Sequence, residues 1–359
     1  MKRNIKKFLF PAVAVAVLSF AACSDWTETE SLDINYPTLE EQNPELYKQY
    51  LKALRDYKAG EHKVVLVSMD NTTSAPAQRN EHLTTMPDSV DIICLMNPDN
   101  LHPTLAGEFA KVREKGTRVI YNIDYNAIEK LWEKVLADEE ANKPEEPTNP
   151  STPEATQDEG GEGGGEGEPT PEEELELRFL EFCRQQTVSQ LNLCAKYGYD
   201  GVQVNYTGRA PQAMQEEEKA QYAARQEAFF SNVKTWNEAN SGKVLVFQGN
   251  PQNLIDKSVL GECDYIVIPA LTATSADKMS FAVLMAAVED VPTDRFVIGV
   301  TTPSLTDLSD ESGYFSGYEA DGKTRVRATK GAAQWVVSPA SGYEKLGSPS
   351  PTRRTTIST

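Results

Sequence analysis

The stretch Tyr199-Asp-Gly-Val-Gln-Val-Asn-Tyr-Thr207 combines an Asp-Gly pair with a strict alternation of valines and polar residues. This period of two is typical of a β-strand, in which every second side chain points to the same face. Gln203, Asn205 and Thr207 therefore share one face of the predicted strand. We expect this face to carry the functional site, because three polar side chains follow one another on it.

Similar apolar runs occur on both sides of this stretch, and helical segments separate most of them. The predicted strands are Lys63–Asp70, Val90–Met96, Thr117–Asp124, Gly201–Tyr206, Lys243–Gln248, Tyr265–Leu271 and Arg295–Val300. The predicted helices are Pro103–Lys115, Ala127–Ala141, Glu172–Tyr197, Glu216–Asn240 and Ser275–Val288. Near-continuous apolar strands that alternate with helices indicate an α/β fold with a parallel sheet. No Gly-x-Gly-x-x-Gly motif follows the first strand, so a (β/α)8 TIM barrel is favoured over a dinucleotide-binding sheet.

The predicted barrel spans residues 61–346 and lacks a clear eighth strand. The segment 347–359 contains two prolines and no apolar alternation, which argues against a central strand. We interpret this anomalous tail as the product of a shifted reading frame. If the tail is native, the barrel is incomplete at the eighth strand.

The stretch that begins at Asp200 resembles the strand-four signature of glycoside hydrolase family 18, Asp-Gly-x-Asp-x-Asp-x-Glu with an aromatic residue before the glutamate. More narrowly, the chain resembles family-18-like lipoproteins that Bacteroidetes encode beside glycan-uptake systems. Some of those proteins are endo-β-N-acetylglucosaminidases, and others bind glycan at the cell surface. The resemblance covers roughly Lys63 to Tyr343, and it implies a ligand that contains N-acetylglucosamine, such as an N-glycan or a chitin-like oligosaccharide.

The chain departs from this signature at the positions that carry the chemistry. The Asp200-Gly pair matches, and Tyr206 keeps the aromatic place. Gln203 replaces the second aspartate, Asn205 replaces the aspartate that orients the acetamido group of the substrate, and Thr207 replaces the acid glutamate. A threonine hydroxyl cannot protonate a leaving oxygen near neutral pH, and general-acid assistance contributes roughly 10²–10⁴ in rate. The resemblance therefore implies a site without a catalytic residue.

Polar and aromatic residues at the predicted strand ends are the candidates for sugar recognition, because sugars are held by a few placed polar groups and aromatic surfaces. The candidate glycan-binding residues are Gln203, Asn205, Tyr206, Thr207, Tyr121, Asn122, Gln248, Asn250 and Trp335. Trp335 fits two interpretations, a platform for a sugar ring and a packed helix residue. The sixth predicted strand ends Ile268-Pro-Ala-Leu271, without the tyrosine that family members usually carry there, which also favours loss of activity.

The N-terminal region predicts a secreted lipoprotein. Residues 1–22 combine a basic start with an apolar run that is too short for a membrane span of about 20 residues. Phe20-Ala-Ala-Cys23 resembles a bacterial lipobox, in which Cys23 is the lipidated residue. The acidic residues that follow resemble a surface-export signal, so we predict a tether and first helix over residues 23–60 and an anchor in the outer membrane, exposed at the cell surface. A cleaved soluble protein and an ordinary solvated tether are the alternatives.

The net charge of −19 is concentrated in one tract of the chain. Between Asp138 and Leu177 there are 15 acidic residues and one basic residue, which leaves −5 for the rest. Within this tract, residues 143–171 are rich in Pro, Glu, Thr and Gly, and we predict a disordered insertion in a surface loop of the barrel. The chain has no basic stripe, so no nucleic-acid partner is expected.

Besides Cys23, the cysteines are Cys94, Cys183, Cys194 and Cys263, which lie in or beside apolar segments. We interpret them as buried thiols rather than as disulfides. The three histidines fall in loops without ligand spacing, and no motif indicates a cofactor. Neither a metal site nor a cofactor is predicted.

The favoured function is a surface glycan-binding protein that derives from a family 18 glycosidase and does not cut its ligand. One alternative is an active glycoside hydrolase with a displaced acid, for which Asp70, Asp124 and Asp200 are the candidates. Another is an assembly subunit of an outer-membrane glycan importer. A TonB-dependent transporter pair is the protein partner that these interpretations suggest.

Overall fold

The computed structural model describes residues 37–72, 75–142, 169–304, 307, 309–340, 343 and 356–358. The chain divides into two compact units, Met1–Tyr50 and Leu51–Thr359. In the first unit, α2 (Leu39–Gln42) precedes the beginning of α3 (Pro44–Ala59). The second unit contains the rest of α3 and all the strands described below, so it carries the candidate site.

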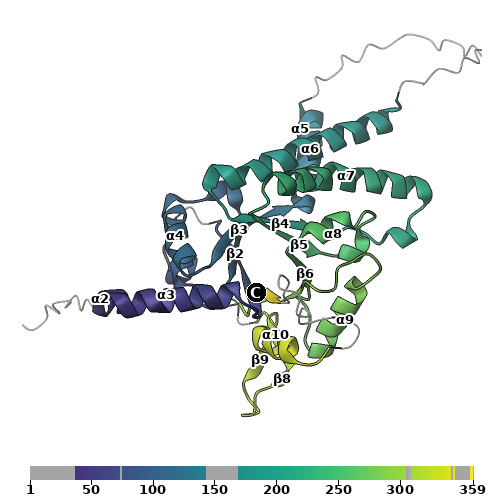
Figure 1. Ribbon diagram of the computed structural model, residues 1–359. Helices are drawn as coiled ribbons and strands as arrows, with labels where there is room; N and C mark the ends of the chain where they lie inside the picture. Colours follow the sequence, from purple (N-terminus) through teal and green to yellow (C-terminus); the bar gives the residue numbers. More distant parts are fainter. Residues whose placement is uncertain are drawn as a thin grey trace, which may run out of the picture. The chain divides into compact units, whose positions relative to one another are not determined.

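Seven parallel strands form a curved sheet with helices between them, and each matches a strand predicted from the sequence (Figure 1). These strands are β1 (Val64–Met69), β2 (Ile92–Leu95), β3 (Arg118–Asp124), β4 (Gly201–Tyr206), β5 (Val244–Gly249), β6 (Tyr265–Pro269) and β7 (Phe296–Gly299). From β1 to β7, each strand pairs in parallel with the next one along the chain. The predicted α/β barrel is therefore confirmed.

The eighth position of the barrel is filled by β10 (Thr356–Ser358), which pairs in parallel with β1 and β7 and closes the ring. The expectation that the tail contributes no central strand is wrong for these residues, which follow the prolines and include two β-branched side chains. The strand has only three residues, so it closes the ring over a short length, and the eighth unit of the barrel is incomplete, as the composition of the tail predicts. Residues 347–355 lie outside the described part of the chain, and the frameshift interpretation stays a prediction.

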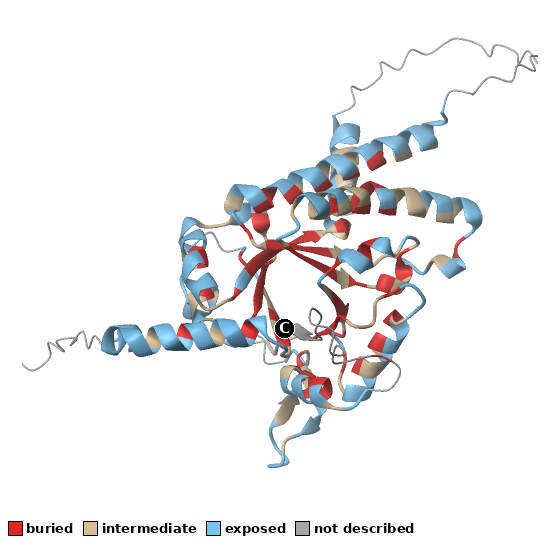
Figure 2. Cartoon of the chain, viewed as in Figure 1, coloured by how far each residue is buried: buried red, intermediate tan, exposed pale blue. Residues whose placement is uncertain are grey.

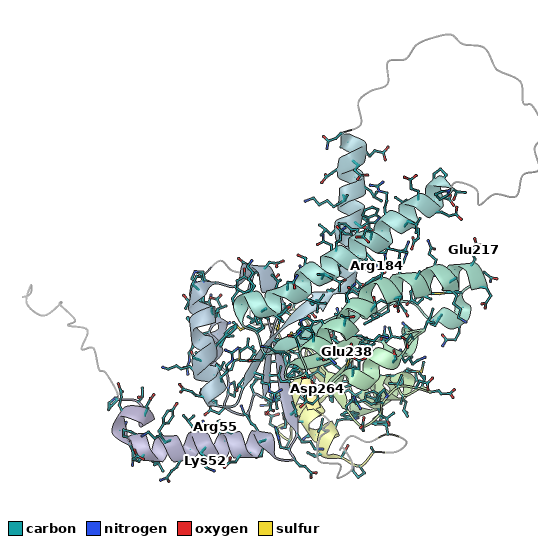
Figure 3. The ribbon with its side chains drawn as sticks, turned by 45° about the horizontal axis from the view of Figure 1, so that its top comes forward. Lys52, Arg55, Arg184, Glu217, Glu238 and Asp264 are labelled. Carbon is teal, nitrogen blue, oxygen red and sulfur yellow. The ribbon has the colours of Figure 1, made fainter. Side chains whose placement is uncertain are left out.

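Helices cover the outer face of the strands. They are α4 (Pro103–Glu114), α5 (Tyr125–Ala141), α6 (Pro171–Tyr197), α7 (Glu216–Ala239), α8 (Ser258–Glu262), α9 (Ala276–Ala286) and α10 (Ala328–Val337). The short 3₁₀ turns are η1 (Arg79–Glu81), η2 (Leu83–Thr85), η3 (Pro98–Asn100), η4 (Pro211–Ala213) and η5 (Pro251–Asn253). Charged side chains of the long helices, such as Arg184, Glu217 and Glu238, lie exposed on the outside (Figure 3).

Local sequence signals explain where these helices begin and end. At the start of α6, the Thr170 hydroxyl accepts a hydrogen bond from the Glu173 amide and the Glu173 carboxylate accepts one from the Thr170 amide, which is a capping box. The helix ends at Gly198, whose φ of 70° is the left-handed conformation typical of a helix C-terminus. The antiparallel hairpin of β8 (Tyr314–Tyr318) and β9 (Arg325–Arg327) was not predicted.

Two hydrophobic clusters lie on the two faces of the sheet. The members of the smaller cluster all come from strands, so they fill the barrel interior: Val64, Leu66, Ile92, Cys94, Ile120, Val244, Val246, Val267 and Val297. The larger cluster also contains helix residues and lies between the strands and the helices. Figure 2 shows the strands buried and the helices buried on part of their surface. Aliphatic side chains and one cysteine thus form the interior cluster, with Met96 and Tyr265 packed against it, and the buried aromatic residues of the core lie in the larger cluster.

Several predicted segments lie outside the described residues: the signal segment 1–22, the tether up to residue 36 and residues 143–168 of the predicted insertion. The structure resumes at residue 169, and α6 begins two residues later. No helix in the described part of the chain is both long enough and apolar enough to cross a membrane.

Gly201 is needed because β4 and β5 approach each other closely at this position. A Cβ atom there would lie 2.1 Å from the carbonyl oxygen of Val244. We expect Gly201→Ala to lower the free energy of unfolding by about 3 kcal/mol, because backbone must shift to relieve the overlap. Gly107→Ala on α4 is the matched control: its Cβ would meet nothing within 4 Å, and alanine stabilises a helix by about 0.5–1 kcal/mol. Urea unfolding measures both, and equal midpoints for the two variants would contradict this account.

The four cysteines outside the N-terminal segment are free and buried, as predicted. Burial raises the pKa of Cys183 to about 11, and it raises the pKa of Cys94 and Cys263 as well. In a Cys23→Ser variant, we therefore expect no thiol to react with an aromatic disulfide reagent at pH 8 while the protein is folded. All four should react after unfolding in guanidinium, since the thiols then ionise near pH 8.5. Rapid labelling of the folded protein would show that this core opens.

Candidate functional site

The register of β3, β4 and β5 determines which side chains of β4 face the barrel interior. Gly201 pairs with Ile120 on β3 and with Val244 on β5. Both partners belong to the interior cluster. Because side chains repeat every two residues along a strand, Gln203 and Asn205 face the interior as well. The predicted polar face of this strand therefore lies inside the barrel.

The upper layer of this interior lies at the carboxyl ends of the strands, the end of the barrel that we call the mouth. Asn205 pairs there with Asp124 on β3 and with Gln248 on β5, and all three are partly exposed. The side-chain amides of Asn205 and Gln248 form no hydrogen bond with another described residue. Two amide groups are thus available to a ligand at the mouth. Each can donate and accept hydrogen bonds, as sugar hydroxyls require.

A second polar layer lies one step deeper. Gln203 is fully buried, pairs in register with Asn122, and donates a 3.2 Å hydrogen bond from Nε2 to Asn122 Oδ1. Its other polar atom, Oε1, has no hydrogen-bond donor among the described residues. An unpaired buried acceptor costs about 1–3 kcal/mol, so this position favours a bound hydroxyl or an ordered water.

Thr207, which the sequence aligns with the acid glutamate of the family signature, directly follows β4. Its hydroxyl accepts a 3.0 Å hydrogen bond from Asn126 Nδ2. Its carbonyl oxygen accepts bonds from Asn250 Nδ2 at 3.1 Å and from Asn253 Nδ2 at 2.8 Å. Three asparagines, one in the first turn of α5 and two in the η5 turn after β5, therefore hold this residue in place, and none of these groups is ionisable.

The carboxylates that were candidates for a displaced acid have structural roles. Asp124 accepts a 3.0 Å hydrogen bond from the Asn126 amide and caps α5. Asp70 accepts bonds from the Thr72 amide and from Asn97 Nδ2, both at 3.0 Å. These two residues follow or end a strand, so both lie toward the mouth.

Asp200 lies at the other end of the barrel, because it precedes β4. It forms a 3.0 Å ion pair with Arg113 on α4 and accepts a 2.8 Å hydrogen bond from the Val119 amide on β3. A strand of six residues separates it from the mouth by about 20 Å. Asp200 is therefore wrong as a candidate for a displaced acid.

Glu129 on α5 is another carboxyl group that could act as an acid. It is partly buried, and burial raises its pKa. A raised pKa is typical of a general acid. However, Glu129 interacts with Tyr125 and Arg225, and these two side chains pack on the aromatic residues Phe229 and Phe179 between the helices. Glu129 thus belongs to the helix layer and does not replace the acid at the mouth.

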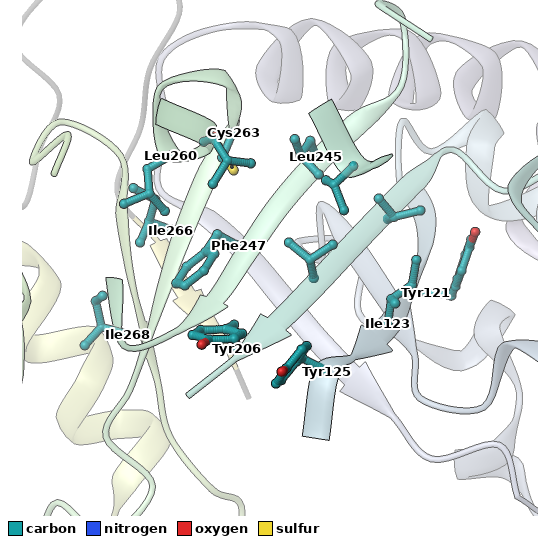
Figure 4. Packing of buried hydrophobic residues seen from close by; sticks show 14 of the residues in the cluster. Tyr121, Ile123, Tyr125, Tyr206, Leu245, Phe247, Leu260, Cys263, Ile266 and Ile268 are labelled. Carbon is teal, nitrogen blue, oxygen red and sulfur yellow. Dashed lines mark hydrogen bonds between the residues drawn. The ribbon is translucent and has the colours of Figure 1, made fainter. Parts of the chain in front are cut away.

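Two of the predicted aromatic candidates face the helices instead of the mouth. Tyr121 is fully buried and donates its hydroxyl to the Gln190 carbonyl on α6 at 2.7 Å. Tyr206 is also buried, lies 4.9 Å from Tyr125 between ring centroids, and accepts a hydrogen bond from Gln226 (Figure 4). Both residues are one position out of phase with the inward side chains, so the pleat of the strand turns them outward.

Trp335 is a packed helix residue, and its interpretation as a sugar platform is wrong. It is only 2% exposed on α10, and its indole nitrogen donates a 2.9 Å hydrogen bond to Ser280 on α9. Its ring stacks on Tyr343 with centroids 6.2 Å apart. The residue therefore stabilises the contact between two helices.

The structure thus brings together part of the predicted site. Asn122, Gln203, Asn205 and Gln248 share the interior face, with Thr207 and Asn250 at its rim. Sequence reasoning missed Asn126 and Asn253, which fix the position of Thr207. Their position shortly after a strand was the available signal, but nothing in the sequence indicates which of these segments meet. Among the described residues, no cluster of His, Cys, Asp and Glu could hold a metal ion.

The barrel and its modified strand-four motif define a glycosidase-type fold, and comparison with known proteins gives the family. The model of glycoside hydrolase family 18, BT1044-like, matches residues 27–158 and 172–348. The chain belongs to this family. No curated protein matches the sequence.

Solved structures with a similar fold have low sequence identity to this chain. A Glu-to-Gln variant of BT1044 is 16% identical over 74% of each chain, with a TM-score of 0.45. A family 18 chitinase from Pseudoalteromonas aurantia is 10% identical over 83% of this chain and 93% of its own, with a TM-score of 0.44. A family 18 chitinase from Chromobacterium violaceum is 12% identical over 83% of this chain and 78% of its own, with a TM-score of 0.42.

The outward position of Tyr121 has a measurable consequence. We expect Tyr121→Phe to lower the free energy of unfolding by about 1 kcal/mol, because the buried carbonyl groups of α6 lose a hydrogen-bond donor. Glycan affinity should stay unchanged, since the side chain lies on the far side of the strand from the mouth. Urea unfolding and calorimetry measure the two quantities. A loss of glycan affinity without a loss of stability would contradict this account and would show that Tyr121 contacts the glycan.

Proposed function

We propose that this protein is a non-catalytic glycan-binding member of its family, which binds oligosaccharides containing N-acetylglucosamine and releases them uncut. The observation that carries the proposal is the inward face of β4, where Gln203, Asn205 and Thr207 present only uncharged groups toward the mouth. Amides on the neighbouring strands extend this face. Such groups suit hydrogen bonding to sugar hydroxyl and acetamido groups.

The same observation supports the absence of turnover. Hydrolysis requires a group that protonates the leaving oxygen, and here Thr207 holds that position by a hydrogen bond from Asn126. It also requires a negative charge that stabilises the positive charge of the transition state, and Asn205 cannot supply one. The nearest carboxylate in the sheet is Asp124, which pairs with Asn205 and caps α5. If the protein is instead an active hydrolase, Asp124 is the favoured candidate for the acid, because it lies beside Asn205.

The proposal includes a location and a partner. A lipid at Cys23 would hold the barrel at the outer membrane, with the mouth available to glycans outside the cell. Capture without cutting is useful where a transporter takes up the bound oligosaccharide, so a TonB-dependent transporter pair is the proposed partner. The assembly-subunit alternative predicts co-purification with such a transporter in the absence of any sugar affinity.

Calorimetry with chitotetraose and with released N-glycans tests binding, and chromatography of the same samples tests turnover. We expect saturable binding and intact oligosaccharide after prolonged incubation. Asn205→Ala should weaken binding about tenfold, the effect of losing one hydrogen bond of about 1.4 kcal/mol. Gln185→Ala is the matched control, because this exposed amide contacts Glu181 on the outer helix α6.

Two results would contradict the proposal. Hydrolysis that Asp124→Asn abolishes would show an active enzyme with a displaced acid. Equal affinities of the Asn205→Ala and Gln185→Ala variants would show that the mouth of the barrel is not where the glycan binds.

A further inference from the structure

A second cavity lies at the end of the barrel opposite the mouth, where β3, β4 and β5 begin. Its volume is about 710 Å³, within the range of small-molecule sites. Its charged lining residues are Arg55, Lys58, Arg113, Arg118, Lys243 and Asp200. We call this site the basic cavity. Five cationic side chains face one carboxylate there, in a chain whose net charge is −19.

Carbonyl oxygens accept hydrogen bonds from three of these cations. Lys58 donates to the Val90 carbonyl at 2.5 Å, Arg55 to the Glu114 carbonyl at 2.6 Å, and Lys243 to the Tyr199 carbonyl at 2.5 Å. Carbonyl oxygens orient a cation without neutralising it. Of the lining cations, Arg113 is the one that forms an ion pair with the lining carboxylate, Asp200.

Other carboxylates act on the cluster from outside the cavity. Asp91 and Asp88 attract Lys58, and Asp91 also forms a 2.8 Å hydrogen bond with His62 Nε2 and accepts one from the Val65 amide. Asp264 attracts Arg118 and accepts a 3.0 Å hydrogen bond from the Leu245 amide. None of these three carboxylates lines the cavity. Its interior therefore keeps an excess of positive charge.

The cavity also has groups that are open to a ligand. The guanidinium of Arg118 is exposed and forms no hydrogen bond with another described residue. Gly242, in the turn before β5, faces open space, because a Cβ atom there would meet nothing within 4 Å. Guanidinium groups bind phosphate and sulfate through paired hydrogen bonds, which a lysine cannot reproduce.

We propose that the basic cavity binds a phosphate or sulfate ester group, with Arg118 as the main ligand and Arg55 and Lys243 beside it. The ester group belongs either to a substituted sugar or to a lipid headgroup, and both present the same tetrahedral oxyanion. The strand length of about 20 Å separates this site from the mouth, so the two sites share no residue. The inference does not depend on the proposed glycan site.

Calorimetry with inorganic pyrophosphate at low ionic strength tests the site on the full chain. We expect saturable binding with one ion per protein, which weakens as salt screens the charges. Arg118→Ala should weaken it about tenfold, and Arg118→Glu should abolish it. Arg184→Ala is the matched control, because this exposed arginine lies on α6 (Figure 3) and should leave binding unchanged. Because the Arg118 side chain is exposed, both substitutions should preserve the fold, and circular dichroism checks this.

Two further arms identify the source of the ester group. Glucose 6-phosphate and glucose 6-sulfate are compared with glucose by calorimetry, and phosphatidylglycerol vesicles are compared with phosphatidylcholine vesicles by flotation. Binding that Arg118→Glu removes, in either arm, supports the site and names its source. The proposal is overturned if pyrophosphate does not bind, or if it binds equally to the Arg118→Glu and Arg184→Ala variants. Asn205→Ala should bind pyrophosphate normally, which separates this result from that of the glycan experiment.

Discussion

The parallel register that joins β3, β4 and β5 is the constraint on which the candidate site depends. It places Asn205 between Asp124 and Gln248, and it directs the side chain of Tyr206 toward the helix layer. A shift of one residue would bring the tyrosine into the barrel and move the amides to the helix layer. The close contact of Gly201 with the next strand helps to fix this register, since a side chain there would push the strands apart.

The two halves of the strand-four motif have different roles in this fold. Asp200 and Gly201, which match the family signature, are structural: the aspartate joins α4 and β3 to the start of β4, and the glycine allows close strand pairing. Gln203, Asn205 and Thr207, which depart from the signature, face the interior and the mouth. The residues that match the signature thus build the barrel, and those that differ from it line the proposed site. This division agrees with the proposed role in glycan binding.

Most of the fold could be predicted because the strands are continuous apolar runs and the long helices lie between them. The missed elements are short or polar, and they include the five-residue α8, the hairpin of β8 and β9 and the three-residue β10. The site was predicted less well. Tyr121 was assigned to the mouth from its place near a strand end, but its phase along β3 turns it toward α6. Trp335 could not be assigned, because its partner Ser280 is distant in the sequence.

The sequence by itself determined the order of strands and helices, the polar face of β4 and the absence of an acid at Thr207. These properties depend on local periodicity and on residue identity, which the sequence states directly. The tertiary structure alone decided which polar groups meet: the asparagines that hold Thr207, the unpaired Oε1 of Gln203 and the gathering of cations at the far end of the barrel. Each of these arrangements joins residues from separate elements. Their proximity follows from closure of the sheet, and no local pattern encodes it.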